Sequence, residues 1–160
     1  MPTWLRSSPL ARKLWIGRPQ GSTSTVAYLF DTDTISAVLR PRPDLAVVRR
    51  LAAVPPDEQF TSAVTLAELL FGALRKGRVD LVERIEALAE TVPVLPFHNA
   101  AARMYAELRT ELERRGTPLA EPDLRIAAIA RSFDLVLVTG NERHFRRVPD
   151  LTVENWIESP

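Results

Sequence analysis

Three carboxylates that could act together are spread over the middle of this sequence. Asp31 and Glu68 each come soon after an apolar segment, and Asp123 opens an Ala-rich helical pattern. Carboxylates gathered in a partly dry cleft repel one another, so one of them takes up a proton unless a cation offsets the charge. Oxygen ligands without His or Cys suit Mg²⁺ or Mn²⁺ and not zinc.

A magnesium site of this kind would direct the chemistry toward phosphate. Mg²⁺ takes only one or two carboxylates, keeps several waters and leaves positions for the oxygens of a substrate phosphate. That combination favours the cleavage of phosphodiesters. The spacing of the acids supports this interpretation only if the fold brings them together.

Each acid also has a purely structural interpretation. Asp31 or Asp33 fits the N-cap of a following helix. The segment 65–68 (TLAE) fits a capping box, in which Glu68 bonds back to the cap residue. Asp123 follows Pro122 in a first helical turn, where the helix dipole favours a carboxylate.

Short apolar runs alternate with helical patterns and predict the frame that positions these residues. Strands are expected at residues 26–30, 60–63, 92–95, 135–138 and 151–153. Helices are expected at residues 66–74, 79–90, 97–115 and 122–133. The alternation indicates an α/β fold with an open, mostly parallel sheet and helices on both of its faces.

In such a sheet the ligand site lies beyond the carboxyl ends of the strands, where the strand order reverses. Residues 31–34 (DTDT) follow the first expected strand, and Glu68 comes after the second. Residues 139–142 (TGNE) follow the fourth, and Asp123 begins the helix before it. All of these positions fall at one edge of the sheet, so we expect their side chains to be neighbours.

The composition is that of one globular domain. The chain has 160 residues, of which 46% are hydrophobic and 26% charged. Cysteine is absent, which excludes disulfides, thiolate metal sites and Cys nucleophiles and is in keeping with a reducing cytoplasm. No apolar run approaches the ~20 residues of a membrane span. We therefore expect a cytoplasmic protein without a membrane partner.

Residues 1–25 differ in composition from the rest of the chain. They carry four basic residues and no acid, and residues 21–25 (GSTST) have linker composition. We expect a flexible N-terminal extension over 1–25 and a single domain over 26–158. That leaves 17 of the 21 basic residues against all 20 acidic ones. If the chain binds a nucleic acid, it must do so through a local patch and a bound cation, because bulk charge does not favour such binding.

Four stretches of the chain carry a family resemblance. They are YLFDTDTIS (28–36), SAVTLAELLFGALRKG (62–77), PDLRIAAIA (122–130) and LVTGNERHFRRVPDLTVENW (137–156). In this order they resemble the PIN-domain ribonucleases, and most of all the VapC toxins of bacterial toxin–antitoxin pairs. The likeness extends over almost everything from Val26 to Trp156. It implies a PIN-like three-layer α/β/α fold with a mostly parallel sheet of roughly five strands.

The resemblance also implies which residues form the site. The acids of the family fall on Asp31, Glu68 and Asp123. A fourth polar position, Asp in many members, falls on Asn141, which lowers the negative charge of the site. Two positions that support the site rather than bind metal directly fall on Asp33 and Thr139.

The mechanism implied by the resemblance is an in-line attack by a metal-activated water on an RNA phosphodiester, with Mg²⁺ as cofactor and Mn²⁺ as the alternative. Asp31 and Asp123 are expected to be the principal metal ligands. Glu68 is expected to bind the metal through water or to orient the attacking water. Asn141 is expected to fix a ligand or a water by hydrogen bonding.

The resemblance implies three partners, namely an RNA substrate, a VapB-like antitoxin and a second copy of the chain in a homodimer. The candidates to hold RNA phosphates are Arg143, Arg146 and Arg147, which lie beside Asn141 in the sequence. A solvated helix face explains these arginines equally well. His144 is expected to pack or to cap a helix rather than to act as a base.

Two other functions fit parts of the pattern. Residues 31–34 also match the DxDxT motif of haloacid-dehalogenase-like phosphatases, in which Asp31 would be the nucleophile. Those enzymes need a downstream lysine to hold the phosphoryl group, and the chain has only Lys13 and Lys76. A PIN scaffold that binds RNA or protein without cutting is the other alternative, and the presence of all three acids argues against it.

A chain that begins at Val26 should fold and cleave RNA as the full chain does, because residues 1–25 have the composition of a tail. The 19 Arg against 2 Lys point to a GC-rich genome. GTG start codons are common in such genomes, so translation from Val26 is a natural hypothesis. Circular dichroism and an RNA cleavage assay on both chains test this. A loss of solubility or activity would show that the tail contributes.

Overall fold

A five-stranded parallel sheet forms the centre of the structure, a computed structural model that describes residues 26–157. Its strands are β1 (Tyr28–Phe30), β2 (Gln59–Ser62), β3 (Val94–Leu95), β4 (Val136–Val138) and β5 (Val153–Glu154). They lie in the order β3-β2-β1-β4-β5, and every neighbouring pair is parallel. The expected α/β fold is confirmed. The extension predicted for residues 1–25 lies outside the described residues.

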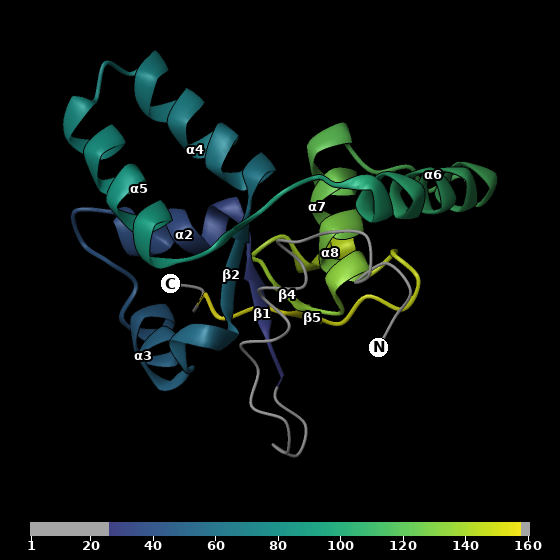
Figure 1. The fold of residues 1–160 in the computed structure, drawn as a ribbon, viewed down its shortest axis with the longest axis horizontal. Coiled ribbons are helices and arrows are strands. Elements are labelled where there is room, and N and C mark those ends of the chain that lie inside the picture. The colour runs from purple at the N-terminus through teal and green to yellow at the C-terminus, as the bar shows by residue number, and fades with distance from the viewer. Residues whose placement is uncertain (1–25, 158–160) are drawn as a thin grey trace.

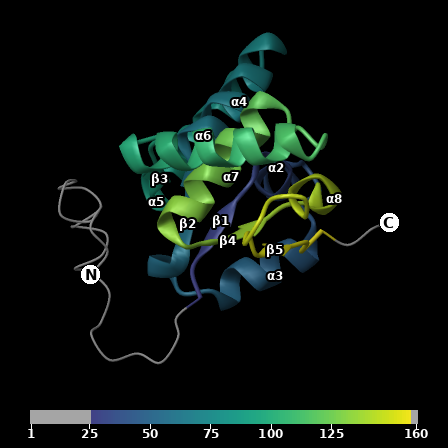
Figure 2. The same ribbon diagram turned by 90° about the vertical axis from the view of Figure 1, so that its right-hand side faces the viewer.

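Helices connect the strands and cover the sheet on both sides (Figures 1 and 2). They are α2 (Thr32–Leu39), α3 (Leu45–Ala53), the short 3₁₀ helix η2 (Pro56–Glu58), α4 (Ala63–Arg75), α5 (Val79–Thr91), α6 (Asn99–Arg114), α7 (Glu121–Phe133) and α8 (Glu142–Phe145). The helices expected at 79–90, 97–115 and 122–133 are confirmed as α5, α6 and α7. The stripe at 66–74 lies in α4.

Helix α3 was not expected from the sequence. Asp44 caps it by accepting hydrogen bonds from the backbone N–H groups of Ala46 and Val47. Its sequence LAVVRRLAA carries an apolar stripe, with Val47 buried and Leu51 partly buried, so the helix was missed although its periodic signal is present.

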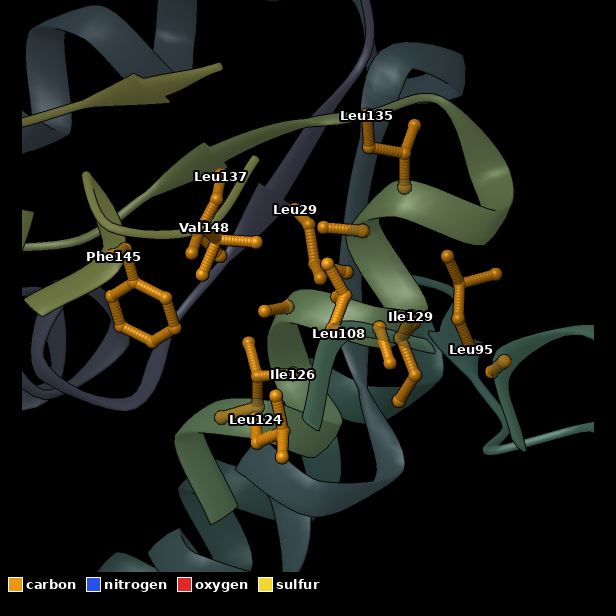
Figure 3. Packing of buried hydrophobic residues seen from close by; sticks show 14 of the residues in the cluster. Leu29, Leu95, Leu108, Leu124, Ile126, Ile129, Leu135, Leu137, Phe145 and Val148 are labelled. Carbon is orange, nitrogen blue, oxygen red and sulfur yellow. The ribbon is translucent and has the colours of Figure 1, made fainter. Parts of the chain in front are cut away.

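The strands are apolar on both faces because each face is covered by helices. In β1, Leu29 packs into one cluster and Phe30 into another, and β4 divides Leu137 and Val138 in the same way. The first cluster, shown in Figure 3, joins the sheet to α6, α7 and α8. The second joins it to α2, α3, α4 and α5. Helical layers therefore cover both faces of the sheet, and a ligand site can form only at the ends or edges of the strands.

No helix within residues 26–157 is long and apolar enough to cross a bilayer.

Candidate active site

The strand order reverses between β1 and β4, and the crevice beyond their carboxyl ends is where a ligand is expected to bind in such a sheet. Asp31 directly follows β1, and Thr139 directly follows β4. The backbone N–H of Asp31 donates to the carbonyl of Val138 at 3.0 Å, and the hydroxyl of Thr34 donates to the same carbonyl at 2.9 Å. These bonds fix the two strand ends against each other.

Asp31 is the most deeply buried acid of the site, with 5% of its surface exposed. It is the N-cap of α2, and its Oδ1 accepts a hydrogen bond from the backbone N–H of Thr32 at 2.7 Å. Its Oδ2 accepts a hydrogen bond from the hydroxyl of Thr139 at 2.8 Å. The predicted N-cap role of Asp31 is thus confirmed. The same residue also lies in the crevice, so the structural role does not exclude a functional one.

Burial is the main reason that the pKa of Asp31 is raised from 3.8 to about 7. The charge of Asp33 raises it further, and that of Asp123 adds a smaller contribution. The hydrogen bonds from Thr32 and Thr139 act in the opposite direction without cancelling the effect. The crevice therefore holds more negative charge than its hydrogen bonds offset.

Glu68 enters the site from the second turn of α4. Its Oε2 accepts a hydrogen bond from the hydroxyl of Thr32 at 2.5 Å. The capping-box interpretation of residues 65–68 is wrong, because Ser62 is the N-cap of α4 and its hydroxyl accepts the backbone N–H of Thr65. With Ser62 in that place, Glu68 is left to point across to α2.

Thr139 links the acids after β1 to the loop after β4. It is fully buried, and its hydroxyl also lies 3.4 Å from each carboxylate oxygen of Asp33. The same hydroxyl accepts a hydrogen bond from the backbone N–H of Asn141 at 3.0 Å. A Cβ placed on Gly140 would lie 2.9 Å from Asp33 Oδ2, which is too close for a side chain here. The loop can approach Asp33 because residue 140 is a glycine.

Asp123 stands in the first turn of α7 as expected, and it brings His144 into the site. Nδ1 of His144 lies 3.6 Å from Asp123 Oδ2 and 2.9 Å from the side-chain nitrogen of Asn141. Burial raises the pKa of Asp123, the contact with His144 lowers it, and the charge of Asp33 raises it slightly.

The contacts of His144 with two residues of the candidate site were not expected from the sequence. His144 was expected to pack or cap, yet 49% of its side chain is exposed and it contacts two site residues. The sequence offered one indication of this contact. His144 lies three residues after Asn141, and side chains with this spacing are neighbours on the surface of a helix.

The arginines predicted to hold RNA do not form one open cluster. Arg146 pairs with Glu142 of the same helix, with nitrogen–oxygen distances of 3.1 and 2.5 Å. Arg147 donates to the backbone carbonyl of Pro118 at 3.4 Å. Arg143 is exposed and remains available for a ligand.

The predicted site residues form one continuous chain of contacts. It runs from Glu68 through Thr32 to Asp31, on to Thr139 and Asn141, and then through His144 to Asp123. Within residues 26–157, no group of three or more His, Asp or Glu side chains lies close enough together to hold a metal ion. Mg²⁺ needs no such group, because it uses one or two carboxylates and keeps its waters. The excess negative charge and all-oxygen donors fit such a cation.

The family of this chain follows from comparison with known proteins. The PIN domain model matches residues 28–151. The tRNA(fMet)-specific endonuclease VapC of Shigella flexneri is 35% identical over 133 residues, covering 81% of this chain and 97% of the relative. Ribonuclease VapC1 of Haemophilus influenzae (strain R2866) is 32% identical over 130 residues, with the same coverage of both chains.

A solved structure gives the same result. DNA-bound VapBC from Salmonella typhimurium contains a chain with a TM-score of 0.76 and 30% identity, and the match covers 82% of this chain and 99% of that one. The chain therefore belongs to the PIN-domain family, in which its similar relatives are VapC ribonucleases.

The raised pKa of Asp31 predicts how stability changes with pH in metal-free buffer. The folded state holds the proton of Asp31 more tightly than the unfolded chain does. Protonation of Asp31 therefore contributes its full stabilisation of the folded state below about pH 4, and this stabilisation is lost as the pH rises through about 7. Asp31→Asn removes the charge and should raise the free energy of unfolding at pH 8 by up to about 4 kcal/mol. At pH 4 the gain should vanish.

Urea unfolding in EDTA at several pH values measures this difference between the variant and the original chain. Asp57→Asn, at an exposed position on η2, is the matched control and should leave stability unchanged at every pH. Equal pH dependence of the original chain and Asp31→Asn would show that Asp31 is not desolvated as described.

Proposed function

We propose that this protein is a Mg²⁺-dependent endoribonuclease that cleaves RNA with the residues at the β1–β4 crevice. The observation that carries the proposal is the buried carboxylate of Asp31, which lies among further acids and has no hydrogen bond from a basic side chain of residues 26–157. A site of this charge repels phosphate unless a cation is bound. The similarity to proteins named ribonuclease and endonuclease supports RNA as the substrate.

Asp31 and Asp123 are the proposed metal ligands. They come from opposite sides of the crevice, the first from the end of β1 and the second from the start of α7. When bound, Mg²⁺ lowers the pKa of a coordinated water and offsets charge that develops on the phosphoryl oxygens. The two ligand residues differ in burial, since Asp31 is nearly inaccessible and Asp123 is half-buried. Asp123 therefore faces the side from which substrate arrives.

Glu68 is the proposed group that orients the attacking water, either directly or by holding a water of the metal. The hydroxyl of Thr32 fixes one of its oxygens, which leaves the other free to accept a proton from water. Asn141, whose side-chain nitrogen lies 2.9 Å from Nδ1 of His144, is proposed to fix a ligand or a water by hydrogen bonding. Thr139 and Asp33 support the site by fixing Asp31 and the loop after β4.

Removal of the charge of Asp31 should abolish RNA cleavage. Asp31→Asn preserves the size of the side chain but weakens Mg²⁺ binding, and we expect the cleavage rate to fall at least about 100-fold. EDTA should have the same effect on the original chain, and added Mg²⁺ should reverse it. The assay follows a labelled RNA oligonucleotide, with Asp57→Asn as the folded control. Cleavage that survives both Asp31→Asn and EDTA would exclude the metal-nuclease proposal.

The alternatives have less support. A haloacid-dehalogenase-like phosphatase would need a lysine at the nucleophile, but Lys76 lies at the end of α4, eight residues beyond Glu68. Membership in the PIN-domain family also does not favour it. A silent scaffold would not need the chain of contacts that joins all three acids.

We further propose that the protein is the toxin of a toxin–antitoxin pair, acts in the cytoplasm as a homodimer, and is restrained by a VapB-like antitoxin. The similar solved structure is a VapBC complex. The chemistry allows inhibition of this site, because a guanidinium can bind carboxylates in a bidentate fork. An arginine of the antitoxin placed beside Asp31 and Glu68 would displace Mg²⁺ and neutralise the acids together.

Expression of the chain alone should slow bacterial growth, and co-expression of the neighbouring upstream gene should restore it. The reason is that free nuclease degrades RNA until the antitoxin covers the carboxylates. Asp31→Asn should be harmless at equal protein level, which separates RNA cleavage from a general burden of expression. A chain that is harmless alone and purifies as an active monomer without a partner would refute the toxin assignment while leaving the nuclease assignment intact.

A further inference from the structure

A groove leads away from the candidate active site between α2, α4 and α5, the three helices at the upper left of Figure 1. Its volume is about 420 Å³, which is in the range of ligand-binding pockets. Thr32 and Glu68, the hydrogen-bonded pair of the active site, line one end. The groove is therefore continuous with the place where RNA is proposed to be cut.

Two helices with their C-caps supply most of the residues that line the groove. Thr32, Ser36 and Arg40 line it from α2 and its C-cap, with the spacing of successive helical turns. Glu68, Gly72 and Lys76 line it from α4 and its C-cap with the same spacing. The first and last lining residues of each wall are eight positions apart, which is about 12 Å at 1.5 Å per residue. We call the end at Glu68 the acidic end and the end at Arg40 and Lys76 the basic end. The distance between them along each helix is that of about three stacked nucleotides, at about 3.4 Å each.

The basic end carries two cations that are not neutralised. Arg40 and Lys76 are both exposed and form no ion pair with any of the residues 26–157. Arg78 also lines this end, but its guanidinium donates two hydrogen bonds to Asp80, at 2.8 and 2.7 Å. Arg40 and Lys76 are therefore the groups with free charge for an anion in the groove.

Gly72 keeps the middle of the groove open. Glycine in a helix interior is unfavourable by about 0.5–1 kcal/mol relative to alanine, so it needs a reason. Close packing is not the reason, because a Cβ at this position would meet no atom within 4 Å. The empty space that a side chain would enter is the groove itself.

We propose that this groove binds a single-stranded segment of the RNA substrate, about three nucleotides long, next to the cleaved bond. Arg40 and Lys76 bind its phosphates at the far end, and Gly72 gives the strand room to pass. The inference rests on the proposed function. It assigns the RNA contacts to residues other than Arg143, Arg146 and Arg147.

The distribution of charge favours RNA over a protein segment as the occupant. The described part of the chain has an excess of acid, yet the far end of this groove carries unpaired positive charge. A strand that places one phosphate at the metal site and another at Arg40 and Lys76 matches both ends. The mixed polar and apolar walls, with Leu39 and Leu81 among them, also allow bases to lie against them.

The first test measures RNA binding by fluorescence anisotropy in the full chain carrying Asp31→Asn, which binds without cutting. Arg40→Gln and Lys76→Gln, added singly, should each raise the Kd for a single-stranded oligonucleotide about threefold and reduce the salt dependence by about 0.7 in the log–log slope. Arg103→Gln, at an exposed position on α6, is the matched control and should change neither quantity.

The second test fills the groove. Gly72→Ala should leave the protein at least as stable as the original, whereas Gly72→Leu should fold normally and raise the KM for RNA about tenfold with little change in kcat. Thermal unfolding of both variants shows that any loss comes from obstruction and not from misfolding. An unchanged KM in folded Gly72→Leu would refute a strand in this groove.

The outcomes separate this inference from the proposed function. If the original chain cuts RNA and none of the three positions affects binding or KM, the groove proposal is wrong and the nuclease stands. If the chain binds RNA through Arg40 and Lys76 but does not cut it, the groove stands and the nuclease is wrong. If these residues affect only the binding of a protein partner, that partner is the occupant and the RNA groove is rejected. RNA that does not bind at all rejects both.

Discussion

The burial of one carboxylate between two strand ends is the constraint on which the structure depends. Asp31 is held by the backbone N–H of Thr32, a local bond, and by the hydroxyl of Thr139, a bond that requires β1 and β4 to be adjacent. That adjacency is the reversal point of the sheet order. The folded state therefore keeps a charge that it does not neutralise, a cost that a protein tolerates where function needs it.

Several residues of the candidate site also stabilise the fold, so the effect of a substitution on the site is hard to separate from its effect on the fold. Ser62 caps α4 and so leaves Glu68 free, while Asp31 both caps α2 and anchors the crevice. Gly140 allows the loop after β4 to approach Asp33. Because a helix cap contributes about 1 kcal/mol, a substitution at Asp31 changes the start of a helix as well as the charge of the site.

The sequence was sufficient for the sheet and most helices, because buried strands and long amphipathic helices leave strong periodic signals. It failed where a choice depended on tertiary contacts. Two residues could cap α4, and only the structure shows that Ser62 does so and not Thr65. The contact of His144 with Asp123 depends on how α7 and α8 lie against each other, which the sequence alone does not reveal. Helix α3 was missed although its sequence carries an apolar stripe.

The hydrogen bond between Asp31 and Thr139 joins residues 108 positions apart, and this separation has a consequence during synthesis. A ribosome adds about 5–20 residues per second, so about 5–20 s pass between translation of the first half of this contact and the second. Once Glu68 has been added, about a third of the way through that interval, the nascent chain contains Asp31 and Glu68 but still lacks the strand that completes the crevice. A partly made chain on the ribosome therefore carries the acids in an unassembled form, and translation itself delays the appearance of the finished site until β4 has emerged.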